Sequence, residues 1–180
     1  MPGFSFPAPR DLSEIVKYAL LEREAPDQIR MIWEEHHSSR SDCVARVVSS
    51  AEYEGFRARA RKFPNFVYPV MKGDGNFFTL FAQWQDRHCI FTYLDDYRRD
   101  PVAAEPYLSI SFFDDLLERK GMVLVRGDYS WHLTKQESER VVDAVEHFYL
   151  KDPTMVETFN TRPDSFDFNK LISVVSGLHA

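Results

Sequence analysis

Two adjacent histidines are the first residues whose chemistry could build a site. His36 and His37 follow Trp33-Glu34-Glu35 in a stretch with helical periodicity, and Cys43 is the nearest further metal ligand in the sequence. A zinc-binding helix places two ligands four residues apart on one face, whereas adjacent helical residues point about 100° apart. We therefore predict that this segment is a helix end that holds no metal.

The two cysteines, Cys43 and Cys89, could act as nucleophiles if a histidine activated the thiolate. His88 adjoins Cys89, but neighbouring residues in a strand face opposite sides of the sheet. Both cysteines also lie in apolar runs, which is typical of buried and unreactive thiols. We predict two free thiols and no catalytic residue, so the chain is expected not to be an enzyme.

Three further motifs have ordinary explanations. Gly73-Asp74-Gly75 lacks the lysine and the following helix of a phosphate-binding loop, and it predicts a hairpin turn. Arg126-Gly127-Asp128 predicts a turn that ends a strand. The acidic pairs Asp95-Asp96 and Asp114-Asp115 follow strands, where carboxylates cap helical turns. We therefore expect no cofactor.

The segment 155–171 has a different composition, because three phenylalanines stand in it among polar residues. Its turn formers predict backbone that runs over the surface: Asn160, Pro163, Asp164 and Ser165. Aromatic and arginine side chains on such a segment can supply most of the energy of a protein contact. The alternative is that the phenylalanines face inward and fix the last helix to the sheet. We predict a partner-binding surface that consists of Phe159, Asn160, Arg162, Phe166 and Phe168.

The surrounding helices and strands must position these residues. Residues 11–64 read mainly as helices, with capping boxes at Asp11/Glu14 and Ser49/Glu52 and one strand at 43–48. In residues 65–130 the hydrophobic period changes to two, which predicts strands at 66–70, 77–84, 89–94, 107–112 and 122–125. Residues 134–180 read mainly as helices again, beginning with a Thr134/Glu137 capping box.

The fold class that follows is α+β. We predict a central antiparallel sheet, a meander of about five or six strands, with helices at the N- and C-terminal ends packed on it. Residues 1–10 contain three prolines and predict a mobile lead-in, and residues 11–180 predict a single globular domain.

Composition and charge exclude several classes of protein. The chain of 180 residues has 28 acidic and 22 basic side chains, a net charge of −6 that argues against nucleic-acid binding. The cationic stripe over residues 57–62 is therefore expected to be a solvated helix face. No apolar run approaches the roughly 18 residues that span a bilayer, so we expect no membrane insertion. Fifteen Phe, eight Tyr and three Trp favour a sheet-rich core or an aromatic binding surface.

Short pieces of sequence, in order through almost the whole chain, carry a resemblance to a known family. They are Pro9–Leu12, Ile32–His37, Pro64–Pro69, His88–Leu94, Gly121–Tyr129, and Val156–Pro163 followed by Phe166–Leu171. With these pieces the chain resembles the ATP synthase assembly factor 1 family, which are chaperones for the catalytic head of mitochondrial ATP synthase.

The resemblance implies a monomeric chaperone that binds the free β subunit and prevents its aggregation until the α subunit replaces it. A lone β subunit exposes the apolar interface that it later buries against α, and such patches aggregate. The resemblance also implies that the protein is located in the mitochondrial matrix. Residues 1–7 show no targeting pattern. We therefore expect any presequence to lie outside this sequence.

One alternative stays open. The chain could be a small-molecule-binding protein or an enzyme that uses an aromatic-lined pocket on the sheet. The polar groups of such a pocket would be Thr92, Ser109 and Ser111.

Overall fold

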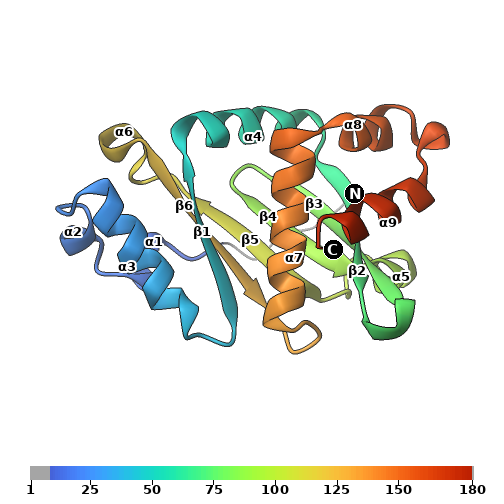
Figure 1. The fold of residues 1–180 in the computed structure, drawn as a ribbon, viewed down its shortest axis with the longest axis horizontal. Coiled ribbons are helices and arrows are strands. Elements are labelled where there is room, and N and C mark those ends of the chain that lie inside the picture. Colours follow the sequence, from blue (N-terminus) through green and yellow to red (C-terminus); the bar gives the residue numbers. More distant parts are fainter. Residues whose placement is uncertain (1–8, 180) are drawn as a thin grey trace.

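A computed structural model describes residues 9–179. The predicted lead-in over residues 1–10 therefore lies outside the described residues, except for Pro9 and Arg10. The centre of the fold is a six-stranded antiparallel sheet with the strand order β1-β6-β5-β4-β3-β2 (Figure 1). The strands are β1 (Cys43–Ser49), β2 (Asn65–Met71), β3 (Phe77–Gln85), β4 (His88–Tyr93), β5 (Pro106–Phe113) and β6 (Met122–Tyr129). The predicted α+β class with its antiparallel meander is confirmed.

Helices precede, interrupt and follow the sheet. They are α1 (Leu12–Ile15), α2 (Tyr18–Leu21), α3 (Pro26–Ser38), α4 (Ser50–Lys62), α5 (Leu94–Arg99), α6 (Leu117–Lys120), α7 (Lys135–Glu146), α8 (Thr154–Thr161) and α9 (Phe168–Gly177). A π-helical turn, His147–Lys151, continues α7, and 3-10 turns cover Gly73–Gly75 and Pro163–Ser165.

The predicted capping boxes start two of the long helices. The backbone N–H of Ser49 donates to Glu52 Oε2 at 2.8 Å, and that of Thr134 donates to Glu137 Oε2 at 2.9 Å. In return, the hydroxyl oxygens of the capping residues accept from the N3 backbone, so otherwise unpaired N–H groups of the first turn are satisfied.

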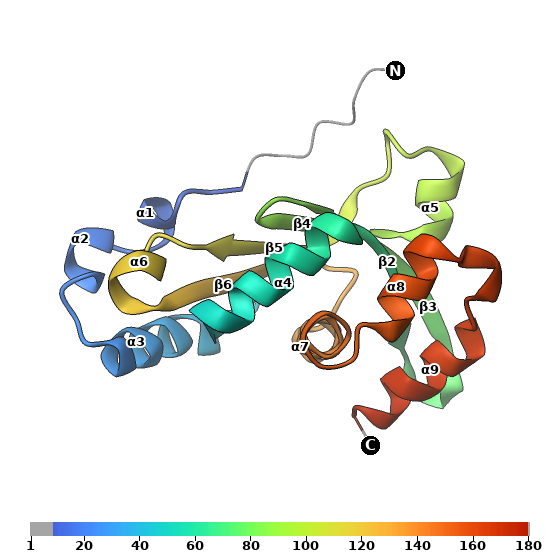
Figure 2. The same ribbon diagram turned by 90° about the horizontal axis from the view of Figure 1, so that it is seen from above.

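The two faces of the sheet bury different clusters, because successive strand residues point to opposite sides. On β6, Val123 and Val125 belong to the larger core with α4, α7, α8 and α9, whereas Met122 and Leu124 pack with Trp33 and other residues of α1–α3. Figure 1 shows α1–α3 gathered beside β1 and β6, and α7–α9 toward β2. Figure 2 shows that α5 lies on the other side of the β2–β3 region from α9.

Two sequence predictions about these elements are wrong. The spacing of the apolar residues Leu12, Ile15, Val16, Ala19 and Leu20 predicts a single helix, but Val16 is extended and separates α1 from α2. A helix of that length is marginal alone, and the break lets Leu21 enter the core while Leu20 stays exposed.

The second wrong prediction is the turn at Arg126-Gly127-Asp128, because β6 continues through these residues to Tyr129. β6 pairs with β1 on one side and β5 on the other, so Gly127 stands opposite both Val44 and Ile110. A Cβ atom on Gly127 would lie 2.9 Å from Val44 Cγ2, so a glycine fits this close approach.

Candidate partner-binding site

The predicted partner-binding segment is more helical than its turn formers indicated. α8 runs through Asn160 to Thr161, and Pro163 then begins a 3-10 turn that leads to α9. Met155 and Val156 are buried and Phe159 is half-buried, a spacing of one helix face. That spacing was the signal for a helix. The prediction that Asn160 does not continue a helix is wrong, whereas residues 161–165 are exposed, as expected of backbone that runs over the surface.

The three phenylalanines of the segment are half-buried and pack in two groups. Phe159 and Phe166 form edge-to-face contacts with each other, at 5.1 Å between ring centroids, and with the buried Phe66, at 5.6 and 5.9 Å. Phe168 lies 6.0 Å from Phe77, which is 41% exposed at the start of β3. Each of the three rings therefore packs against the core and remains partly exposed.

These rings form one wall of an open groove of about 510 Å³. The residues that line it come from β2, the start of β3, the end of β4, α5, and the segment from α8 to the start of α9. The groove is lined by Val67, Phe77, Phe78, Thr79, Tyr93, Leu94, Asp95, Arg98, Phe159, Phe166 and Phe168. We call these residues the aromatic groove.

The other two predicted site residues lie apart from the lining of the aromatic groove. The amide of Asn160 is bonded to the backbone of Asn65, so this side chain attaches α8 to β2. Arg162 is exposed at the C-terminal end of α8, where its backbone carbonyl accepts from the N–H of Ser165. Of the five predicted residues, the structure thus brings three together in the aromatic groove, namely Phe159, Phe166 and Phe168.

A stack of aromatic rings extends from the groove to the loop after β6. Phe78 and Tyr93 contact Tyr107, Tyr107 stacks on His132 at 3.9 Å, and His132 stacks on Trp131 at 3.7 Å. Trp131 is 87% exposed. We call Tyr93, Tyr107, His132 and Trp131 the aromatic stack.

Sequence reasoning missed the aromatic stack, because its members come from three separate segments. Tyr107 is partly buried against the main core, and its ring partners depend on the order of the strands in the sheet. Carboxylates adjoin the stack, since the Tyr93 hydroxyl donates to Asp95 at 2.9 Å and this bond raises the pKa of Tyr93. Burial, followed by the charge of Asp96, raises the pKa of Tyr107.

Most of the cysteines and histidines considered for catalysis and metal binding are buried or bonded to other groups within the fold. Cys43 and Cys89 are free and buried, and burial raises the pKa of both thiols. His37 Nδ1 lies 2.7 Å from the Trp33 carbonyl, and His88 Nδ1 lies 3.0 Å from Ser111 Oγ. Among the side chains that the structure describes, no group of three or more His, Cys, Asp or Glu is arranged to hold a metal ion.

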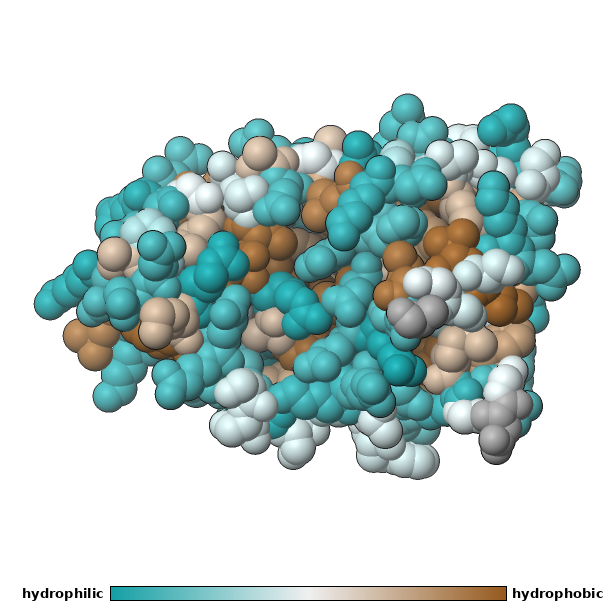
Figure 3. All heavy atoms as spheres, viewed as in Figure 1, coloured by the Kyte–Doolittle hydropathy of each residue, from teal (hydrophilic) through white to brown (hydrophobic). Residues whose placement is uncertain are grey.

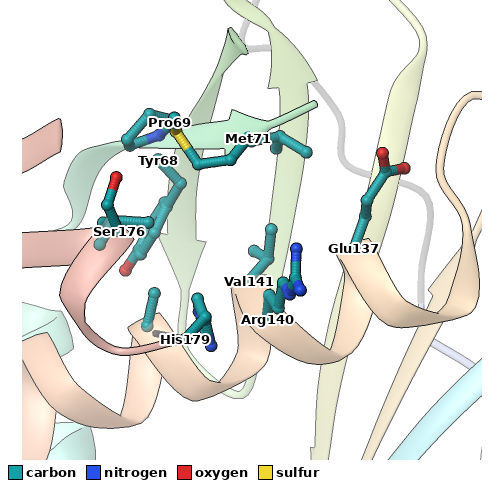
Figure 4. A pocket seen from close by; sticks show the side chains of 11 residues that line it. Tyr68, Pro69, Met71, Glu137, Arg140, Val141, Ser176 and His179 are labelled. Atoms are coloured by element: carbon teal, nitrogen blue, oxygen red, sulfur yellow. The ribbon is translucent and has the colours of Figure 1, made fainter. Parts of the chain in front are cut away.

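A smaller pocket of about 170 Å³ lies between β2, α7 and α9 (Figure 4). Apolar side chains dominate its lining, and Glu137, at its edge, forms an ion pair with Lys72 at 2.6 Å. Thr92, Ser109 and Ser111, the polar groups expected of a small-molecule pocket, do not line it. Figure 3 shows that hydrophobic side chains on this face lie in patches between the helices, separated by hydrophilic ones.

The helices of the part that the structure describes include none that is long and apolar enough to cross a membrane.

Comparison with known proteins identifies relatives of nearly the whole chain. The profile of a family described as "ATP11 protein" matches residues 5–172. The mouse and human proteins named "ATP synthase mitochondrial F1 complex assembly factor 1" are each 28% identical over 97% of this chain. "Protein atp11, mitochondrial" of the fission yeast Schizosaccharomyces pombe is 29% identical over 77% of the chain.

The matched regions cover 56% of the mouse protein, 55% of the human protein and 51% of the yeast protein. The chain thus spans about half the length of the curated relatives that it matches.

Proposed function

The chain belongs to the ATP11 protein family, and from this premise we propose that it is an assembly factor for the F1 part of mitochondrial ATP synthase. The observation that carries the proposal is the match of nearly the whole chain to proteins named F1 complex assembly factors. More specifically, we propose that the chain binds the free β subunit and that the α subunit then takes its place on β. The names of the relatives support a mitochondrial location, and we propose that the chain acts in the matrix.

The aromatic groove supports a role in protein binding. An unassembled subunit exposes apolar surface that a partner will later bury, and such surface aggregates unless it is covered. Half-buried rings suit that task, because their orientation is fixed by the core and little side-chain entropy is lost on contact. We propose that Phe159, Phe166 and Phe168 contact the partner, with Arg162 at the margin and Asn160 positioning α8.

The proposed mechanism needs neither catalysis nor a cofactor. The chain covers the apolar surface of β by equilibrium binding, as a monomer, and releases it by competition. Release requires that the affinity for β be weaker than the affinity of α for the same surface.

Refolding of isolated β subunit tests the proposal. We expect an equimolar amount of the chain to suppress light scattering during refolding without ATP, and an unrelated acidic protein of similar size to have no effect. Scattering that is unchanged by the chain would refute the binding of free β.

A further inference from the structure

Three arginines converge on one carboxylate at the end of β3 that lies away from the aromatic groove. The side chains of Arg57 and Arg61, on α4, lie 3.2 and 3.5 Å from Asp86 Oδ1. Arg87 Nε lies 3.6 Å from Asp86 Oδ2. The nine residues of β3 separate this arginine cluster from Phe77 by roughly 30 Å.

The turn between β3 and β4 presents Asp86 to the arginines. Asp86 has a φ of 51°, a left-handed conformation in which Asp and Asn are favoured over other non-glycine residues. The cationic stripe of α4 was predicted to be only a solvated helix face, but the fold adds Arg87 to it from a separate segment.

Cationic charge exceeds anionic charge at this cluster. Three guanidinium groups share two carboxylates, since Arg87 also pairs with Asp114, and Asp114 in turn accepts from the Tyr53 hydroxyl. The Nε atom of Arg57 is buried and has no hydrogen-bond partner in the described chain. Arg61, with its side chain 61% exposed, forms an ion pair with Asp86 and with no other carboxylate whose position the structure describes.

We propose that the arginine cluster is a docking site for an acidic segment of a partner protein. Guanidinium groups bind carboxylates through paired hydrogen bonds. The cluster therefore offers several N–H donors to a single segment that contains Asp or Glu residues. A nucleic acid fits less well, because a chain of net charge −6 repels a long polyanion beyond the range of three arginines. In this account Asp86 is an internal competitor that holds the arginines in place until the acidic segment arrives.

A labelled peptide of alternating Glu and Ala residues tests the proposal with the full chain, and fluorescence anisotropy measures its affinity. Arg61→Glu should weaken binding roughly five- to tenfold, since one attractive exposed ion pair becomes repulsive. Asp86→Asn should strengthen binding roughly two- to fivefold, because it removes the competing carboxylate and Asn accepts the same φ. Arg23→Glu, an equal charge change at an exposed residue between α2 and α3, is the control and should have a much smaller effect.

The sign of the Asp86→Asn effect separates docking from a merely structural ion pair, which would lose stability and gain no affinity. Absence of peptide binding in the wild type, or weaker binding by Asp86→Asn, would overturn the proposal. So would a single-stranded oligonucleotide that binds more tightly than the peptide and responds to the same variants. Because the assay contains no ATP synthase subunit, its failure would leave the proposed assembly function standing.

Discussion

The side-chain amide of Asn160 bonds both backbone groups of Asn65. Asn160 Nδ2 donates to the Asn65 carbonyl at 2.7 Å, and the Asn65 N–H donates to Asn160 Oδ1 at 3.3 Å. This helical side chain therefore occupies the place of a neighbouring strand at the start of the edge strand β2. It also fixes α8 against the sheet, so that Phe159, one residue earlier, faces Phe66.

Substitution of Asn160 with Ala should destabilise the fold. Both groups of Asn65 would lose their partner in a half-buried position, and we expect a loss of about 1–3 kcal/mol in the free energy of unfolding. Urea denaturation measures this loss. Thr161→Ala, which removes an exposed hydroxyl bond to Glu157, is the matched control and should change stability by less than about 0.5 kcal/mol. A loss at Asn160 no larger than the control would disprove the attachment.

The sequence specified local structure well in this chain and long-range partners poorly. The capping boxes at Ser49 and Thr134 and the period-two strands were predictable, because each depends on residues a few positions apart. The pairing of Gly127 with Val44 depends on the sheet order, and so does the stacking of Tyr107 on His132. No pattern of neighbouring residues in the sequence predicts these two long-range contacts. Asn160 was read as a turn former because its tertiary bond to Asn65 could not be foreseen.

Phe168→Ala should reduce both stability and partner affinity. The ring is half-buried against Phe77, so we expect a loss of about 1–2 kcal/mol of stability, less than the 3–5 kcal/mol of a fully buried ring. As a wall of the aromatic groove, it should also contribute to the affinity for the β subunit. Thermal melts and binding measured at a temperature where the variant stays folded separate the two effects. If the folded variant bound the β subunit with the affinity of the wild type, Phe168 would contribute to the core and not to the partner contact.

We also propose that the aromatic stack, which extends from the aromatic groove, contacts the partner, and Trp131→Ala tests this proposal. Its side chain is 87% exposed, so the variant should lose less than about 0.5 kcal/mol of stability. An aromatic anchor of a protein contact supplies about 2 kcal/mol or more, which corresponds to about thirtyfold in Kd for the β subunit. Val102→Ala, at another highly exposed apolar residue, is the control. Equal Kd values for Trp131→Ala and the wild type would exclude the stack from the interface.

Stability should fall as the pH is lowered from 7.5 to 5.5. His37 and His88 are buried, and burial lowers the pKa of both imidazoles. The charge of Arg126, whose Nη1 lies 3.4 Å from His37 Nε2, lowers the pKa of His37 further. Below the ordinary histidine pKa of about 6.5 the unfolded state binds more protons, so protonation favours unfolding.

Urea denaturation at a series of pH values measures this dependence. His37→Gln should flatten it, because one of the two buried imidazoles is gone. The change in stability per pH unit, rather than the absolute stability, is the relevant readout, since the variant also loses a contact to Arg126. A slope of the opposite sign in the wild type, with stability rising as the pH falls below 6.5, would contradict the buried neutral histidines.

The central claim is that the chain binds the free β subunit and yields it to α, and sedimentation velocity of the mixed proteins tests it most directly. We predict that chain and β sediment together as a one-to-one complex without ATP. Addition of α should return the chain to its free sedimentation rate as α and β combine. A mixture in which the chain and β sediment separately, or in which α fails to displace the chain, would contradict the account.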